Sequence, residues 1–245
     1  MREQWYREFY DRKQNERLDT SDAESNVPRL VKTLHIVTER QPTRILDIGC
    51  GDGQFTSRLF QVPKVKEIYG VDIVENHVDM ARARGIKAYK IDVDSDNLPF
   101  KSGFFDAIVC GEVIEHLFDP DHLLDEIYRV LSNTGFCVLT TPNLAALYNR
   151  ICLLFGFQPF YTSVSSRNDG IGKPMRWFSG GGGHIRVFTY RAFKEILISH
   201  SFKIIKTMGS SPHNTNRTPT WINTIERVIS FFPSLSSTPI FIIRK

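Results

Sequence analysis

The sequence has few cysteines and no long apolar run, and both absences narrow the class of protein. The four cysteines (Cys50, Cys110, Cys137 and Cys152) form no C-x-x-C pair and no metal-finger spacing, so we expect free thiols in a reducing compartment. No stretch reaches the roughly 18 apolar residues that a membrane-spanning helix needs. The first five residues lack the apolar core of a signal peptide. We therefore expect a cytoplasmic protein.

A strong charge of either sign is also missing. The net charge is +4 and the pI is near 8.9, with no basic stripe along the chain. We therefore do not expect a nucleic acid partner. The 245 residues are 41% hydrophobic and 24% charged, which is ordinary for a globular domain with a full hydrophobic core.

What the chain does have is a regular alternation of strand and helix patterns with short connections. This alternation predicts an α/β fold with a doubly wound, mostly parallel sheet. Seven strands are expected, at Arg44–Ile48, Glu67–Asp72, Ala88–Ile91, Phe105–Cys110, Phe136–Thr141, Lys203–Met208 and Pro239–Ile243. The expected helices are Ser25–Glu39, one from Gln54, one ending at Arg84, Asp119–Leu131, Tyr190–Ser199 and Asn223–Phe231.

The first strand runs into a turn with three alternating glycines, Gly49, Gly51 and Gly53. Glycine has no Cβ and adopts positive φ, so this turn lets a ligand approach the backbone closely. A dinucleotide fingerprint would need a further glycine where Gln54 stands. The turn thus predicts a small-molecule site at the carboxyl edge of the sheet and disfavours a nicotinamide cofactor.

Three aspartates lie at or next to the carboxyl ends of the first three expected strands, near this turn. Asp72 ends the second strand, where a carboxylate can accept two hydrogen bonds from a ribose diol. Asp92 follows the third strand and is placed to receive an adenine amino group, while Asp47 could hold a cationic amino acid moiety. Taken singly, Asp72 or Asp92 is better explained as a loop carboxylate or a helix cap.

As an ordered set, these segments resemble the class I S-adenosylmethionine-dependent methyltransferases, in particular small-molecule and ubiquinone-pathway O-methyltransferases that carry an E-x-x-E-H pattern. The resemblance covers residues 44–143 tightly and implies a Rossmann-like sheet whose last strand is antiparallel. The matching segments are Leu46–Gly53, Tyr69–Asp72, Ile91–Val93, Leu98–Phe100, Phe105–Val109, Glu112–Leu117 and Val130–Asn143.

The resemblance also implies which residues bind S-adenosylmethionine. By it, Gly49 and Gly51 line the methionine portion, and Asp47 orders its amino end. Asp72 holds the ribose hydroxyls. The remaining implied contacts are with adenine, from Ile73, Asp92 and Val93, and with the surroundings of the sulfonium, from Gly111 and Glu112.

The E-x-x-E-H pattern, Glu112 to His116, adds candidate catalytic residues. His116, Glu115 and His184 are the candidate bases, because an alcohol or phenol acceptor must lose a proton. In two groups of the superfamily, which methylate small-RNA ends and ubiquinone precursors, such residues hold a divalent ion. Glu112, Glu115, His116 and His184 could do so here. Alternatively, the glutamates cap the following helix and His116 is packed, as in relatives without a metal.

Beyond Pro142 the strand and helix alternation stops. Residues 144–160 are apolar with helical spacing, and 161–183 are a polar, glycine-rich loop. We interpret 144–189 as an insertion that forms a substrate lid, with the helix packed as lid or core; the alternative is contact with a lipid surface. The expected single domain then comprises an N-terminal flap (1–40), a cofactor half (41–143), the lid and a C-terminal half (190–245).

The sequence thus predicts a methyltransferase that acts on an oxygen of a small-molecule, sugar or lipid-linked acceptor, with no obligate protein partner. Two alternatives stay open. One is a metal-assisted 2′-O-methyltransferase of RNA ends, which would need a basic groove that this chain does not clearly carry. The other is a cofactor-binding module without catalysis, which gives no physical reason to keep Asp72, Asp92 and the glycine turn together.

Overall fold

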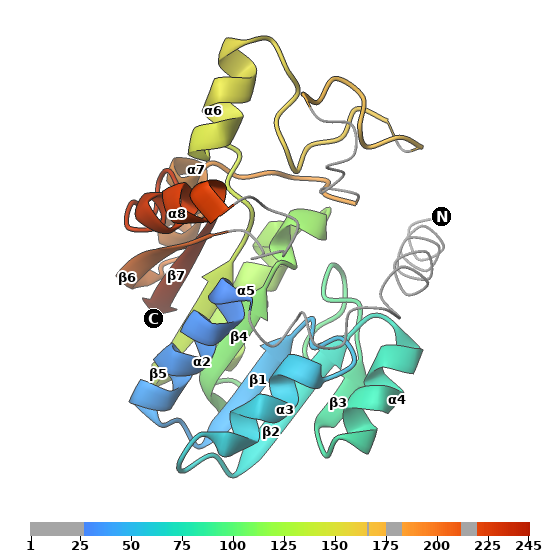
Figure 1. The fold of residues 1–245 in the computed structure, drawn as a ribbon. Helices are drawn as coiled ribbons and strands as arrows, with labels where there is room; N and C mark the ends of the chain where they lie inside the picture. Colours follow the sequence, from blue (N-terminus) through green and yellow to red (C-terminus); the bar gives the residue numbers. More distant parts are fainter. Residues whose placement is uncertain (1–26, 166, 175–182, 212–219) are drawn as a thin grey trace.

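The computed structural model describes residues 27–165, 167–174, 183–211 and 220–245 (Figure 1). A seven-stranded sheet in the order β3-β2-β1-β4-β5-β7-β6 forms its centre. The strands from β1 to β5 pair in parallel, while β7 is antiparallel to both β5 and β6. The predicted α/β, Rossmann-like fold is therefore confirmed. The strands are β1 Arg44–Ile48, β2 Glu67–Asp72, β3 Lys87–Lys90, β4 Phe105–Gly111, β5 Leu131–Thr140, β6 Lys203–Ser210 and β7 Thr238–Arg244.

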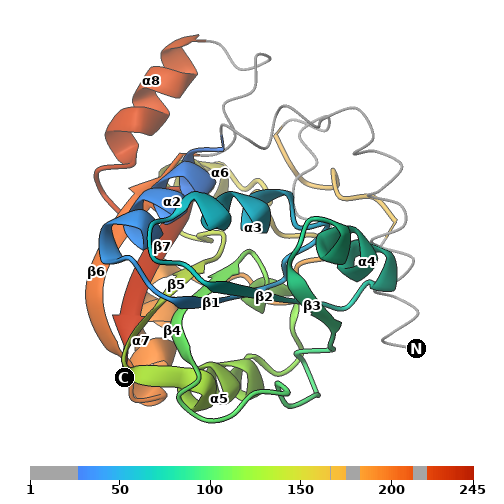
Figure 2. The ribbon, with the colours of Figure 1, turned by 90° about the horizontal axis from the view of Figure 1, so that it is seen from below.

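Helices cover both faces of the sheet. Helices α2, α3 and α4 lie on one face, and α5 and α7 lie on the other (Figure 2). The helices are α2 Pro28–Arg40, α3 Gln54–Arg58, α4 Glu75–Ala83, α5 Pro120–Val130, α6 Leu147–Leu154, α7 Tyr190–Ser199 and α8 Thr220–Ile229, with short 3₁₀ helices at Leu59–Gln61 and Ile114–His116.

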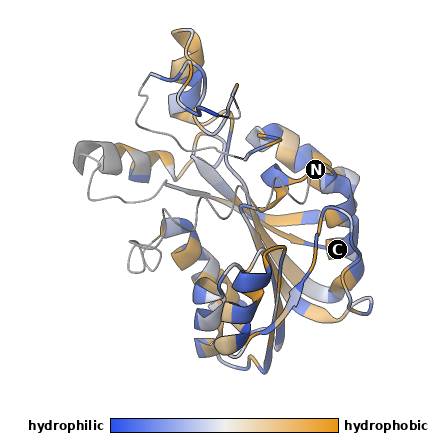
Figure 3. Ribbon diagram, turned by 90° about the vertical axis from the view of Figure 1, so that its right-hand side faces the viewer, coloured by the Kyte–Doolittle hydropathy of each residue, from blue (hydrophilic) through white to orange (hydrophobic). Residues whose placement is uncertain are grey.

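Each face of the sheet has its own apolar core, because strands buried on both sides carry apolar residues in both directions. Leu123, Leu124 and Ile127 of α5 belong to one core, and Ile36 and Val37 of α2 belong to the other. Figure 3 shows the hydrophobic colouring of the central strands between the two layers of helices. All four cysteines are buried free thiols, as predicted.

Several elements begin or end a few residues from their predicted bounds, and two differences are larger. Strand β5 begins at Leu131, directly after α5, so Gly135 lies within the strand rather than in a turn. The register shifts there, because Phe105 pairs with Leu131 but Ala107 pairs with Phe136. An extra stretch in one strand is a bulge, which periodicity alone does not reveal.

The second difference concerns the apolar segment after Pro142. The helix predicted over residues 144–160 is only Leu147–Leu154, and the chain continues without regular structure through the described part of the lid. The expected N-terminal flap up to Asn26, and Arg176, Trp177 and Gly180–Gly182 of the expected lid, lie outside the described residues. No described helix is long and apolar enough to cross a membrane.

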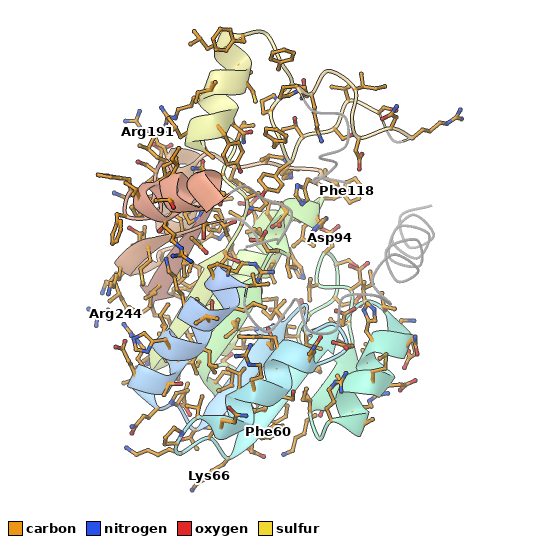
Figure 4. The ribbon with its side chains drawn as sticks, viewed as in Figure 1. Phe60, Lys66, Asp94, Phe118, Arg191 and Arg244 are labelled. Carbon is orange, nitrogen blue, oxygen red and sulfur yellow. The ribbon has the colours of Figure 1, made fainter. Side chains whose placement is uncertain are left out.

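The functional edge of the sheet is the one where β1 to β5 end. Asp94 and Phe118 lie side by side there, above the strands, whereas Phe60 and Lys66 lie at the opposite end (Figure 4). The carboxylate of Asp94 accepts the backbone N–H groups of Phe118, at 3.0 Å, and Asp119, at 2.6 Å. These bonds fix the start of α5 against the loop that follows β3.

Candidate active site

The glycine turn after β1 has the backbone geometry that its sequence predicts. Gly49, Gly51 and Gly53 have φ values of 74°, 54° and 81°, in the left-handed region where side chains are strained. A Cβ on Gly49 would lie 2.4 Å from Cγ2 of Val113, whereas a Cβ on Gly51 would meet nothing within 4 Å. Gly49 therefore permits close packing against Val113, and Gly51 leaves open space beside the turn.

A pocket opens next to this turn, between the ends of β1, β2, β3 and β4. Five of the nine predicted cofactor residues line it, together with His116, one of the predicted catalytic residues. The lining residues are Gly49, Val71, Asp72, Ile73, Ile91, Asp92, Val93, Val113, His116 and Leu117. Asp47, Gly51, Gly111 and Glu112 do not line it. Val113 and Leu117 were not predicted, although their spacing around the E-x-x-E-H pattern places two apolar side chains beside it.

Asp72 connects the pocket to the glycine turn. Its Oδ2 accepts the backbone N–H of Gly51 at 2.9 Å, and its Oδ1 accepts that of Val74 at 2.9 Å. The imidazole Nδ1 of His77 lies 3.5 Å from Oδ1. Each carboxylate oxygen has two lone pairs, so these bonds orient the carboxylate and still leave it able to accept from a ligand.

Asp47 lies behind the turn and is 5% exposed. Burial raises the pKa of its carboxyl group to about 7, although the hydrogen bond from Thr56 and the charge of Arg29 lower it in part. The Thr56 hydroxyl donates to Oδ2 at 2.5 Å. A carboxylate kept in such a place at the cost of desolvation is a mark of functional sites.

Arg29, in the first turn of α2, was predicted only as part of the N-terminal flap and not as a site residue. Its charge lowers the pKa values of both Asp47 and Glu115. Its Nη1 would lie 3.2 Å from a Cβ placed on Gly111. The guanidinium thus brings a positive charge to the ends of β1 and β4. The available signal was a charged residue among the first apolar positions of the α2 pattern.

The predicted catalytic residues Glu115, His116 and His184 come together, although 67 residues separate His116 from Gly183, whose carbonyl it contacts. One ligand atom from each of the three lies within 4.8 Å of the others. Backbone bonds hold the segments together, since the N–H groups of Ile185 and Arg186 donate to the carbonyl of Glu115 at 2.9 and 3.0 Å.

Glu115 is fully buried at the centre of this cluster. Its Oε2 accepts a hydrogen bond from Thr141 Oγ1 at 3.1 Å, but its Oε1 has no hydrogen-bond partner in the described part of the chain. Burial, and secondarily the charge of Glu112, raise the pKa of Glu115 well above its usual range. A buried carboxylate oxygen without a partner is costly, which indicates a site built for a proton or a cation.

Both imidazoles are oriented by backbone carbonyls. Nδ1 of His116 lies 2.9 Å from the carbonyl of Gly183, and Nδ1 of His184 lies 2.9 Å from that of Tyr161. The two ring centroids are 4.9 Å apart. Since a carbonyl only accepts, Nδ1 carries the hydrogen in each contact, and the neutral form of each ring has its lone pair on Nε2.

Glu112, the fourth predicted metal ligand, is not part of the group of three described side chains. It has a φ of 58°, which is strained for a residue with a Cβ, and its Oε1 accepts from Thr140 Oγ1 at 3.0 Å. The neighbouring threonines, Thr140 and Thr141, thus each hold one glutamate. Neither glutamate caps α5, because Asp119 does so by accepting the N–H of His122.

The chain is similar in sequence to known methyltransferases. Residues 46–139 match the family model described as "Methyltransferase domain". The chain is 30% identical to a demethylmenaquinone methyltransferase of Thermus thermophilus over 112 residues, which are 44% of this chain and 51% of that protein. It is 29% identical to a ubiquinone biosynthesis O-methyltransferase of Xanthomonas oryzae over 105 residues, or 41% and 43% of the two chains. The chain thus spans about half the length of these curated relatives.

Solved structures share the fold over nearly the whole chain. A SAM-dependent methyltransferase of Thermotoga maritima, described as a possible histamine N-methyltransferase, has a TM-score of 0.66 and 19% identity, covering 97% of this chain and 99% of that one. A putative methyltransferase complexed with the Trm112 activator in Haloferax volcanii has a TM-score of 0.61 and 17% identity, covering 90% of each chain. The fold is therefore that of class I S-adenosylmethionine-dependent methyltransferases, and the resemblance predicted from the motifs is confirmed.

Proposed function

We propose that this protein transfers a methyl group from S-adenosylmethionine to an oxygen of a small-molecule acceptor. The observation that carries this proposal is the adjacency of two features at one sheet edge. The pocket beside the open glycine turn contains the Asp72 carboxylate, and His116, which lines the same pocket, belongs to the cluster with Glu115 and His184. A donor site and a group able to accept a proton are thus side by side.

The pocket suits the nucleoside part of the cofactor. Asp72 is oriented by two backbone N–H groups and would accept from the ribose hydroxyls. Ile73 and Val93 supply apolar contact for the adenine ring, and Asp92 would receive its amino group. These roles match those that the sequence resemblance implies.

The open space at Gly51 suits the amino acid part. Gly49 and Gly51 would pass along the methionine chain, and Gly111 and Glu112 would border the sulfonium. Asp47 would order the amino group, directly or through the turn, while the nearby guanidinium of Arg29 would attract the carboxylate. S-adenosylmethionine brings a methyl group that is already activated, so the protein needs only to orient the acceptor and exclude water.

The cluster of Glu115, His116 and His184 would take the proton of the acceptor hydroxyl. A backbone carbonyl holds Nδ1 of each imidazole, so the neutral ring has its lone pair on Nε2, which is the form a general base needs. A phenol or alcohol acceptor must lose its proton and therefore needs such a base, whereas a neutral amine acceptor could react without one. The O-methyltransferase named among the relatives is consistent with an oxygen acceptor, and a lipid-linked or aromatic acceptor is included in the proposal.

A divalent cation in the same cluster is a second candidate, because Oε1 of Glu115 is buried without a described partner. Glu115, His116 and His184 would hold the ion, and their mixed carboxylate and imidazole donors fit several metals. The carbonyls at Nδ1 of both histidines resemble the outer contacts that orient metal-bound imidazoles. The ion would lower the pKa of an acceptor hydroxyl.

Calorimetric titration of the purified protein tests the donor. We expect micromolar binding of S-adenosylmethionine and S-adenosylhomocysteine and none of NAD. Asp72→Asn should weaken adenosyl binding about tenfold or more, because it removes a charge-assisted hydrogen bond to the ribose. Asp79→Asn, on the exposed face of α4, should leave it unchanged. Failure of both adenosyl ligands to bind, with the circular dichroism of a folded protein, would overturn the proposal.

Titration with Mg²⁺ and with Zn²⁺ tests the second candidate. If the cluster holds an ion, His184→Ala should abolish binding, whereas His35→Ala, on the exposed side of α2, should not. Absence of binding by the wild type shows that the cation candidate is wrong and leaves the acid–base role. An acceptor screen with dialysed protein then measures turnover independently of the ion.

A further inference from the structure

Helix α6 is amphipathic in the reverse sense from a helix of a globular core. Its buried residues are Asn149 and Cys152, while Ile151, Leu153 and Leu154 are 49%, 57% and 80% exposed. A surface helix ordinarily turns its apolar stripe toward the protein and its polar side toward water. Apolar packing among the described residues therefore does not explain the orientation of α6.

A polar side chain fixes this orientation. The Asn149 amide donates to the carbonyls of Asn143, at 3.2 Å, and Phe160, at 3.4 Å, and accepts the N–H of Phe160 at 2.8 Å. At the start of the helix, the N–H of Leu147 donates to the carbonyl of Leu235 at 2.9 Å. The apolar side of α6 cannot turn inward without breaking the buried bonds of Asn149, which are costly to leave unmade.

The loop that follows α6 also exposes large apolar residues. We call the exposed apolar residues of α6 and of this loop the apolar tip. It projects beyond the carboxyl edge of the sheet, away from the strands (Figure 1). Its members are 43% to 80% exposed: Ile151, Leu153, Leu154, Phe155, Phe157, Val164 and Ile171. Exposed apolar residues gathered in this number on one projecting segment mark a surface that binds a partner.

The charges next to the apolar tip indicate its partner. Between residues 147 and 174, the exposed charges of described side chains are those of Arg150 and Arg167, and both are positive. The acidic residue in this range, Asp169, is partly buried and accepts a hydrogen bond from Ser163 Oγ at 3.0 Å. Apolar side chains at a convex tip with arginines beside them fit an anionic lipid surface, where the former enter the acyl boundary and the latter pair with headgroups.

We propose that the apolar tip docks the protein on an anionic lipid bilayer. The docking places the site close to molecules dissolved in the membrane, because the loop from the tip reaches Tyr161, whose carbonyl contacts His184 at 2.9 Å. A lipid-borne acceptor then reaches the cluster of Glu115, His116 and His184 without crossing water. This last step rests on the proposed methyl transfer, whereas the docking itself does not.

Vesicle flotation of the full chain tests the docking. The probes are phosphatidylcholine vesicles with and without phosphatidylglycerol. We expect the protein to float with the anionic vesicles, and Phe155→Ser to lower its partition about tenfold or more, as the loss of one inserted aromatic side chain implies. Phe60→Ser is the matched control, because Phe60 is 45% exposed at the opposite end of the molecule (Figure 4). It should float like the wild type.

Three measurements complete the test. Arg150→Glu should lower partition onto anionic vesicles only. Thermal unfolding and S-adenosylhomocysteine affinity should be unchanged in Phe155→Ser, so loss of docking and loss of the cofactor site are told apart. No flotation of the wild type, equal loss in Phe60→Ser, or loss in Phe231→Ser on the turn after α8 instead of Phe155→Ser would overturn the proposal. So would sedimentation of a dimer that Phe155→Ser dissociates, since a second copy would then cover the tip.

Discussion

Helices α5 and α6 carry similar apolar residues but expose them to opposite degrees. In α5, Leu123 and Leu124 are fully buried against the sheet, and its start is capped by Asp119. In α6, Leu153 and Leu154 face away from the protein while Asn149 faces inward. The comparison teaches that an apolar helical pattern defines one surface of the helix, while the location of polar partners decides whether that surface becomes core or remains outside.

Truncation of one leucine in each helix tests the comparison most strongly. Leu124→Ala should lower the free energy of unfolding by about 2–5 kcal/mol, since it removes a fully buried side chain and leaves a cavity. Leu154→Ala, at 80% exposure, should change it by no more than about 0.5 kcal/mol. Urea unfolding of both variants measures the difference. Equal effects would show that the tip of α6 is packed, and would also remove the basis for lipid docking.

The two regions also differ in what the sequence could predict. The strands β1 to β4 lie close to their expected positions because short buried runs bounded by Gly, Pro and Asp are local signals. The approach of His184 to Glu115 depends on the path of the loop between them, which no local pattern encodes. The orientation of α6 depends on bonds between Asn149 and Phe160 that periodicity does not report. The motif positions were predictable, whereas their long-range partners, such as Arg29, were not.

The cofactor half and the α6 side of the molecule also differ in a buried ionisable side chain. In the cofactor half this side chain is Asp47. Its pKa is about 7 in the folded protein against 3.8 for an ordinary Asp, so the folded state holds the proton longer. Stability from this group should therefore fall as pH rises from about 4 to about 7, by at most about 4 kcal/mol, and stay level above. Asp47→Asn should remove this decline and make the protein more stable at pH 8, while weakening binding of S-adenosylhomocysteine.

Urea unfolding at pH 5 and pH 8 measures this effect, and calorimetry measures the affinity. Asp79→Asn, which changes an exposed aspartate of α4, controls for the loss of one surface charge. If Asp47→Asn is less stable than the wild type at pH 8, then the bond from Thr56 outweighs the desolvation of the carboxylate, and the prediction is wrong.

Helix α5 is also joined to the end of α7 by polar contacts of a histidine with two of its aspartates. His200, after α7, contacts Asp121 and Asp125 of α5 through Nε2 and Nδ1, each at 2.8 Å. Burial alone would lower the pKa of His200, but the hydrogen bonds to the two aspartates outweigh it and raise the pKa. The stabilisation is complete below pH 6.5 and is lost as pH rises through the raised value.

We expect His200→Ala to cost about 1 kcal/mol at pH 6 and less at pH 9, a modest value because both aspartates are largely exposed and screened by water. Thermal unfolding at the two pH values provides the measurement. His35→Ala, which removes an exposed histidine paired with Glu39, is the control and should show almost no difference between them. A pH-independent loss in His200→Ala would mean that packing, and not the charge, joins α7 to α5.

The smallest expected effect concerns Lys173, the counterpart of Asp47 on the α6 side. Lys173 is 5% exposed, its Nζ has no hydrogen-bond partner in the described part of the chain, and burial lowers its pKa. Replacing an unpaired buried polar group by an apolar side chain of similar length removes a desolvation cost. Lys173→Met should therefore leave the stability unchanged or raise it by up to about 1 kcal/mol, whereas Lys194→Met, on the exposed side of α7, should have no effect.

Because the loop around Lys173 can open locally without global unfolding, hydrogen exchange of its amides is a more sensitive measurement than the melting temperature. Faster exchange in Lys173→Met would show that the ammonium has a stabilising partner, and slower exchange would show that the loop, like the core around Asp47, retains a buried ionisable group at a cost to stability.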